Sequence, residues 1–170
     1  LHILMHGVAK TTLFLVVGAL AYATGSRSLR ALTGVGRRMP LEGTAYFVGA
    51  LATAGMPPLA CFWSKFYILA GALDWSRAGG AAIVVFLLLE SAVALGWFVY
   101  VGHRVFLSRA PAIATVASGD PPSADQPADL LAGGEWAPRP VAMSAVLVIL
   151  ALLCLLVPSL GLWMLQAVVP

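Results

Sequence analysis

Charged side chains are scarce in this sequence: Asp, Glu, Lys and Arg make up only 10% of its 170 residues, whereas 61% are hydrophobic. Soluble domains carry about 25% charged and about 45–50% apolar residues. The apolar residues here gather in stretches close to the ~20 residues that an α-helix needs to cross a bilayer. The composition therefore argues against a soluble domain and predicts an all-α, polytopic membrane protein.

Cysteines are few as well. Cys61 and Cys154 lie inside apolar segments without a CxxC partner, so neither a redox site nor a metal site is indicated. The net charge of +3 comes mainly from loop arginines beside apolar spans, and no basic patch interleaved with aromatic residues points to nucleic acid. Phosphate-binding glycine loops, G-x-S-x-G motifs and paired carboxylates are missing, so nothing indicates soluble enzyme chemistry or a bound cofactor.

The hydropathy pattern predicts about four membrane-spanning helices. They are expected at residues 1–24, 44–73, 81–101 and 141–157. The connections are a basic loop at 25–43 with a turn near 29–32, a tight polar turn at 74–80, and a loop at 107–140. The last loop has too few apolar residues to pack and is predicted to be flexible. Residues 1–106 thus form the main domain and 141–170 a closing helix, which Pro158 is expected to bend or end.

Nearly all the arginines flank one side of these spans. The side with the 25–43 and 107–140 loops holds seven arginines, whereas the opposite side holds only Arg77; the seven are Arg27, Arg30, Arg37, Arg38, Arg104, Arg109 and Arg139. The positive-inside rule then predicts that these two loops are cytoplasmic and the C-terminus external. The membrane is expected to be the (inner) membrane of a prokaryotic cell. Leu1 already lies in an apolar run with no basic leader or cleavage site, so we expect the C-terminal part of a longer polypeptide.

The second span contains a helix break followed by a charge. Its length exceeds one crossing, and the break falls at Gly55, Met56, Pro57 and Pro58, so two half-helices are predicted. Lys65 follows the break by roughly two helical turns. A lysine at the bilayer centre costs roughly 2.5–3.5 kcal/mol on insertion scales, and the freed backbone groups need protein or water partners. The pattern indicates a partly hydrated site that handles a proton or small cation. The alternative is that Lys65 lies near a helix end and reaches the headgroups.

Four further groups are candidates for proton transfer. His2, His6 and Lys10 follow at i, i+4 and i+8, on one helix face, and imidazole exchanges protons near neutral pH. A metal site is disfavoured because Lys10 repels cations and no Glu or Cys is close in sequence; histidines at the membrane interface are a second alternative. Glu90 is an isolated carboxylate in the third span. It is either a relay member or counter-charge, or a protonated or purely structural group.

Several motifs in the first 73 residues occur in a consistent order. They are His2-x-x-x-His6-Gly-x-x-Lys10-x-x-Leu-Phe, Gly34-x-Gly36-Arg37-Arg38-Met39-Pro40, Gly49-Ala50-Leu51-x-x-Ala54-Gly55-Met56-Pro57-Pro58-Leu59 and Phe62-x-Ser64-Lys65. This series resembles the antiporter-like subunit family: the proton-translocating membrane subunits of respiratory complex I, Mrp-type cation/proton antiporters and membrane-bound hydrogenases. The third and fourth spans fit this family only in hydrophobicity and placement.

The resemblance implies a subunit of about fourteen crossings built from two inverted repeats, each with one broken helix. This chain would hold the end of the second repeat and the closing helices. Lys65 would be the outward proton-exchange group, with Lys10 and the histidines in the hydrophilic axis that feeds it. The partners would be other membrane subunits of an oxidoreductase complex. Their quinone, flavin and nickel–iron chemistry lies in other subunits, so the resemblance implies no cofactor here.

Three other functions remain open from the sequence. A sodium/proton antiporter subunit of the Mrp type would bind sodium at Glu90 or at the carbonyls of the break. A small-molecule transporter would need a roomy polar pocket at the break, which the surrounding apolar residues do not suggest. A purely structural membrane subunit would not depend on Lys65.

Overall fold

The computed structural model describes residues 1–108 and 140–168, with side chains as far as Pro158. Every regular element in this part of the chain is helical, as predicted. The elements are α1 (His2–Thr24), η1 (Val35–Arg37), α2 (Pro40–Ala54), α3 (Ala60–Trp75), α4 (Arg77–Gly102), η2 (His103–Leu107) and α6 (Val141–Val168). The break appears between α2 and α3.

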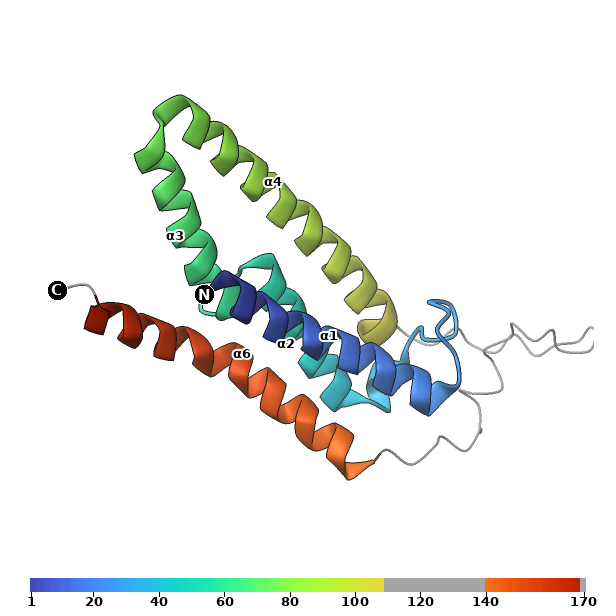
Figure 1. Cartoon of the computed structure of the whole chain (residues 1–170). Coiled ribbons are helices and arrows are strands. Elements are labelled where there is room, and N and C mark those ends of the chain that lie inside the picture. Colours follow the sequence, from blue (N-terminus) through green and yellow to red (C-terminus); the bar gives the residue numbers. More distant parts are fainter. Residues whose placement is uncertain (109–139, 169–170) are drawn as a thin grey trace, which may run out of the picture.

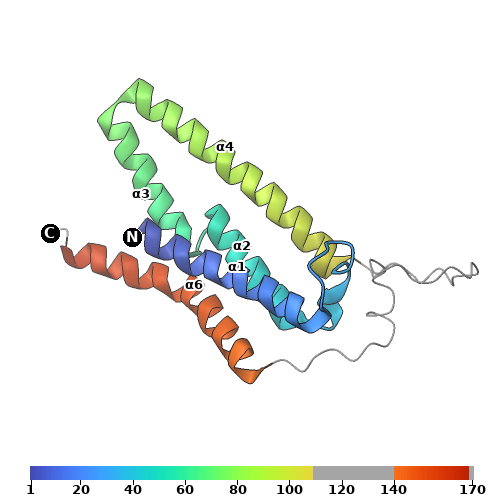
Figure 2. The same ribbon diagram turned by 45° about the vertical axis from the view of Figure 1, so that its right-hand side comes forward.

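The helices form a packed group and a projecting hairpin. Helices α1, α2 and α6 pack against one another, while α3 turns away and α4 returns antiparallel to it (Figures 1 and 2). The far end of α4 comes back to α2, where the Tyr46 hydroxyl donates a hydrogen bond of 3.0 Å to the carbonyl of Phe98. The hairpin is therefore attached to the group at both ends.

Two clusters of buried side chains hold these helices together. The first joins the second half of α1, the 29–39 segment, α2, η2 and Leu147 of α6. The second lies near the break and joins Met5 and Ala9 of α1, Cys61 of α3 and Cys154 of α6. Gly36 is needed for the first cluster because a β-carbon there would run into the backbone of Phe106. The short segment before α2 thus fits tightly against the end of α4.

Three of the described helices are long and apolar enough to cross a membrane: His2–Thr24, Arg77–Leu107 and Val141–Pro158. Helices α2 and α3 have only 15 and 16 residues. Since an α-helix rises about 1.5 Å per residue, neither alone spans a ~30 Å hydrocarbon core. The expected fourth crossing thus depends on the two half-helices acting together.

Two predicted boundaries around the second span were wrong. Helix α2 begins at Pro40 rather than near residue 44, because proline is well suited to the first helical position. The predicted turn at 74–80 shrinks to Ser76, which alone separates α3 from α4. Its hydroxyl accepts a hydrogen bond from the Gly79 amide and caps α4, which is the role that serine favours at a helix start.

The later helices are longer than predicted. Helix α4 runs from Arg77 to Gly102 and continues as the π-helical turn η2. Helix α6 continues through Pro158 to Val168, so Pro158 does not end it; a proline removes a single backbone donor, and the bonds of the other residues remain. Most of the predicted 107–140 loop, residues 109–139, lies outside the described residues.

Candidate functional site

The break between α2 and α3 is built around Gly55. Its φ of 86° is left-handed, a conformation that glycine adopts without a β-carbon clash. The amides of Gly55 and Met56 close the end of α2 by bonding to the Leu51 carbonyl at 3.1 and 3.0 Å. The chain then passes Pro57 and Pro58, and Ala60 starts α3. The last carbonyl of α2, that of Ala54, points beyond the helix end and becomes part of the site.

Lys65 lies against this break. Its ammonium nitrogen Nζ donates hydrogen bonds to Ser91 Oγ at 2.7 Å and to the Ala54 carbonyl at 3.4 Å. Nζ also lies 3.3 Å from Glu90 Oε2, and the Lys65 side chain is only 16% exposed. We call Lys65, Glu90, Ser91 and the Ala54 carbonyl the Lys65 cluster. The cluster brings α2, α3 and α4 together around one amine. The sequence alone does not show which residues of α4 contact Lys65.

A small cavity of about 130 Å³ adjoins the cluster between α3 and α4. Lys65 and Ser91 are its polar side chains, and the rest of its wall is apolar or the backbone of the break. Because one water takes up about 30 Å³ in the liquid, the cavity has room for a few waters. The amine therefore lies beside a space in which water could reach it.

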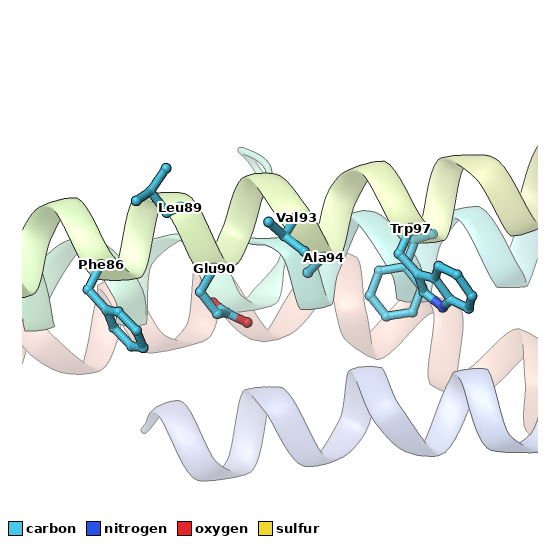
Figure 3. Close-up of a pocket in the computed structure, with 7 residues that line it drawn as sticks. Phe86, Leu89, Glu90, Val93, Ala94 and Trp97 are labelled. Atoms are coloured by element: carbon cyan, nitrogen blue, oxygen red, sulfur yellow. The ribbon is translucent and has the colours of Figure 1, made fainter.

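Glu90 occupies the outer edge of the cluster. Its side chain is 51% exposed, in a groove of about 620 Å³ whose other walls are apolar. Figure 3 shows the carboxylate on α4 between Phe86 and Trp97. The sequence hypothesis that Glu90 is a counter-charge to a lysine is thus compatible with the geometry, since the two groups form an ion pair.

His2 connects α1 to α3. Its Nδ1 lies 2.8 Å from Ser64 Oγ, and Ser64 donates its hydroxyl proton to the Cys61 carbonyl at 3.0 Å. A hydroxyl has only one proton to donate, so when Ser64 donates to the Cys61 carbonyl, Nδ1 of His2 is the donor in the His2–Ser64 bond. Ser64 is buried and directly precedes Lys65 in the chain. The predicted histidine series therefore ends beside the lysine.

The other two members of the predicted series lie farther along α1. The His2 and His6 rings have centroids 5.5 Å apart, and His6 Nδ1 is a buried atom without a hydrogen bond among the described residues. Lys10 is exposed on α1. The described structure thus places His6, His2, Lys65 and Glu90 in one part of the molecule, whereas the Lys10 side chain, on the next turn of α1 after His6, is exposed.

Ser91 in the site and the buried carboxylate Glu42 outside it carry little signal in the sequence. No motif or spacing marks Ser91 in the sequence, and only the α3–α4 pairing places it on Lys65. Glu42 falls in the stretch that the sequence predicts to be a basic loop, whereas the structure buries it fully in the first turn of α2. Carboxylates are common in the first turn of a helix. The sequence around Glu42 therefore does not distinguish a buried carboxylate from an exposed one.

The described residues contain no group of three His, Cys, Asp or Glu side chains arranged to hold a metal ion. Cys154 Sγ lies 3.8 Å from the Thr12 hydroxyl in the buried contact between α6 and α1. What the site offers is a set of proton donors and acceptors: an amine, a carboxylate, two imidazoles and two hydroxyls.

Comparison with known proteins identifies the family of the chain. Residues 1–92 match the family model "NADH:quinone oxidoreductase/Mrp antiporter, TM", which covers α1, the break and the Lys65 cluster. The NADH-quinone oxidoreductase subunit N of Desulforudis audaxviator is 32% identical over 111 residues, 65% of this chain and 22% of the relative. The chloroplastic NAD(P)H-quinone oxidoreductase subunit 5 of Mesostigma viride is 31% identical over 103 residues, 50% of this chain and 16% of the relative.

A third relative is named as an antiporter subunit rather than as an oxidoreductase subunit. The protein named "Putative antiporter subunit mnhD2" of Staphylococcus saprophyticus is 37% identical over 78 residues, 46% of this chain and 16% of that protein. The chain thus spans about a fifth of the length of these relatives or less. The family match covers more than half of the chain, so the protein is an antiporter-like membrane subunit of the NADH:quinone oxidoreductase/Mrp antiporter family.

Proposed function

We propose that this chain is part of a subunit that translocates protons across the membrane, and that Lys65 is its proton-exchange group. The observation that carries the proposal is the Lys65 cluster. An amine just beyond a helix break is withdrawn from solvent yet touches a carboxylate, a hydroxyl and a backbone carbonyl. Ionisable groups inside a membrane typically belong to ion or proton pathways.

The proposed route runs from α1 to α4. Protons pass along water and side chains through Lys10, His6 and His2 to Lys65, and leave past Glu90. The ring contact of His2 with His6 and the bond of His2 to Ser64 support the middle of this route. Lys10 is exposed on α1, so its membership depends on parts of the subunit that pack against that face.

The proposal includes an arrangement in the bilayer. Helices α2 and α3 together form one crossing, interrupted at the Gly55–Pro58 break, beside the three continuous spans. The 25–43 and 107–140 loops are cytoplasmic, the C-terminus is external, and the membrane is the inner membrane of a prokaryotic cell. Other membrane subunits of a complex I-related or hydrogenase-type assembly are the partners.

Sodium/proton antiport is the second candidate function, and one observation favours it. The ammonium of Lys65 is surrounded by three oxygen atoms, from the Ala54 carbonyl, Glu90 and Ser91. Carbonyl, carboxylate and hydroxyl oxygens are ligands for hard cations, so the same position could hold Na⁺ when the amine moves away. Proton transport that needs sodium would favour this candidate.

The test replaces Lys65 in the intact complex. Lys65→Ala should abolish proton transport into membrane vesicles, while Arg30→Ala, which removes an exposed loop cation, should leave it unchanged. Both variants are compared at equal amounts of assembled complex, with and without sodium. Normal transport in Lys65→Ala would rule out the proposal and favour a structural subunit.

A further inference from the structure

Ser91 makes the shortest of the contacts to the Lys65 amine. The Nζ–Oγ distance is 2.7 Å, compared with 3.3 Å to Glu90 Oε2 and 3.4 Å to the Ala54 carbonyl. Charge-assisted N–H···O bonds are typically about 2.7–2.9 Å long. By this measure the bond to the neutral hydroxyl is well formed, whereas the bond to the carboxylate is loose.

The geometry of α4 explains this order. Adjacent residues on a helix point in different directions, so Ser91 and Glu90 reach the amine from different sides and at different distances. Ser91 lines the cavity between α3 and α4 together with Lys65, whereas Glu90 lines the outer groove of α4. The hydroxyl therefore occupies the inner position and the carboxylate the outer one.

From these contacts we infer that Ser91 is a positioning residue: its hydroxyl holds the Lys65 amine in the α3–α4 interface and keeps the pair with Glu90 loose. This inference rests on the proposed function of Lys65. The hydroxyl accepts a hydrogen bond from Nζ and can donate its own proton toward Glu90 Oε2, which lies 3.5 Å away. It thus satisfies the amine without neutralising it.

The consequence concerns proton release. An ammonium in direct contact with a carboxylate in a poorly hydrated site gains a strong Coulomb attraction, and that attraction resists loss of the proton. When the Ser91 hydroxyl is removed, the Glu90 carboxylate is the strongest remaining acceptor, so the Lys65 amine should move into direct contact with it. Ser91 prevents this collapse by providing a nearer, neutral acceptor. Nδ1 of His2, on α1, bonds to Ser64 and not to the amine.

The experiment compares three replacements of Ser91 in the assembled complex. Ser91→Ala removes the hydroxyl, Ser91→Cys keeps the volume but offers only a weak acceptor, and Ser91→Thr keeps the hydroxyl. The cavity of about 130 Å³ beside Ser91 has room for the additional methyl group. Ser144→Ala on α6 is the matched control for loss of a helical serine. Proton transport is measured in vesicles at equal amounts of assembled complex.

We expect Ser91→Ala and Ser91→Cys to lose transport by roughly tenfold, as the loss of one charge-assisted hydrogen bond predicts, and Ser91→Thr to retain most of it. If Ser91→Ala does not assemble, the Cys variant decides. Normal transport in the Cys variant, or equal losses in Cys and Thr, would overturn the inference even if Lys65→Ala is inactive. A fully active Lys65→Ala variant would instead contradict the proposed role of Lys65, on which the inference about Ser91 rests.

Discussion

The aliphatic part of Lys65 lies over Gly55. A β-carbon placed on Gly55 would come within 3.0 Å of Lys65 Cδ, closer than real β-carbon contacts normally are. The glycine thus has two roles in one place. It adopts the left-handed backbone that ends α2, with φ of 86°, and it leaves the space through which the lysine side chain reaches Ser91.

Replacing Gly55 by alanine should therefore affect both stability and transport. A non-glycine residue in the left-handed region costs about 1–2 kcal/mol, and the new methyl group would push the Lys65 side chain away from the cluster. We expect Gly55→Ala to lower the thermal stability of the purified complex and to reduce its proton transport.

Gly96→Ala is the matched control for this change. A β-carbon at Gly96 meets no described atom within 4 Å, and the residue lies inside α4, where alanine is favoured over glycine by up to about 1 kcal/mol. This variant should be at least as stable as the native protein. Equal stability and transport in Gly55→Ala and Gly96→Ala would contradict the double role of Gly55.

A second prediction concerns the attachment of the hairpin to α2. Tyr46 is buried and donates its hydroxyl to the Phe98 carbonyl, so Tyr46→Phe should destabilise the protein by about 0.5–1.5 kcal/mol. Thermal unfolding of the purified complex measures the change. Tyr22→Phe serves as control because the Tyr22 side chain is 54% exposed. If Tyr46→Phe is as stable as Tyr22→Phe, the hydrogen bond from the Tyr46 hydroxyl to the Phe98 carbonyl does not stabilise the attachment of α4 to α2.

The break and Lys65 could be predicted from the sequence because their signals are local. Glycine followed by two prolines cannot continue an α-helix, and a lysine in an apolar segment stands out by composition alone. The periodic spacing of His2 and His6 likewise placed them on one face, and their rings do lie close together. These features follow from a few neighbouring residues.

Glu90 could be named from the sequence as a counter-charge to a lysine, but the contact of Ser91 with Lys65 could not be predicted in the same way. Ser91 meets Lys65 only because Ser76 alone separates α3 from α4 and turns the chain back sharply. The predicted turn at 74–80 was several residues longer, which leaves the register of the two helices undetermined. Glu42 illustrates the same limit: its burial depends on packing between elements, which a carboxylate in a first helical turn does not reveal.

A third prediction tests the link between α1 and α3. The His2–Ser64 bond is 2.8 Å long and part-buried, so a double-mutant cycle with His2→Ala and Ser64→Ala should give a coupling energy of about 0.5–1.5 kcal/mol. The stability of the purified complex provides the readout. His103 and Ser108 form a control pair, exposed and 3.4 Å apart, whose coupling should be smaller. Additive losses in the His2–Ser64 cycle would show that this bond does not join the two helices.

The fourth prediction decides what Glu90 does. Glu90→Gln keeps the shape and an acceptor oxygen but removes the charge and the ability to exchange a proton. If Glu90 takes part in proton release, transport should fall by roughly tenfold or more, whereas Glu90→Asp, which keeps the carboxylate, should retain more activity. Because the Glu90 side chain is half exposed, neither change creates a cavity in the described core, and assembly should be normal. If the Gln variant transports protons at the native rate, Glu90 serves only as a structural partner of Lys65, and the route out of the site must pass from the amine directly to water in the cavity between α3 and α4.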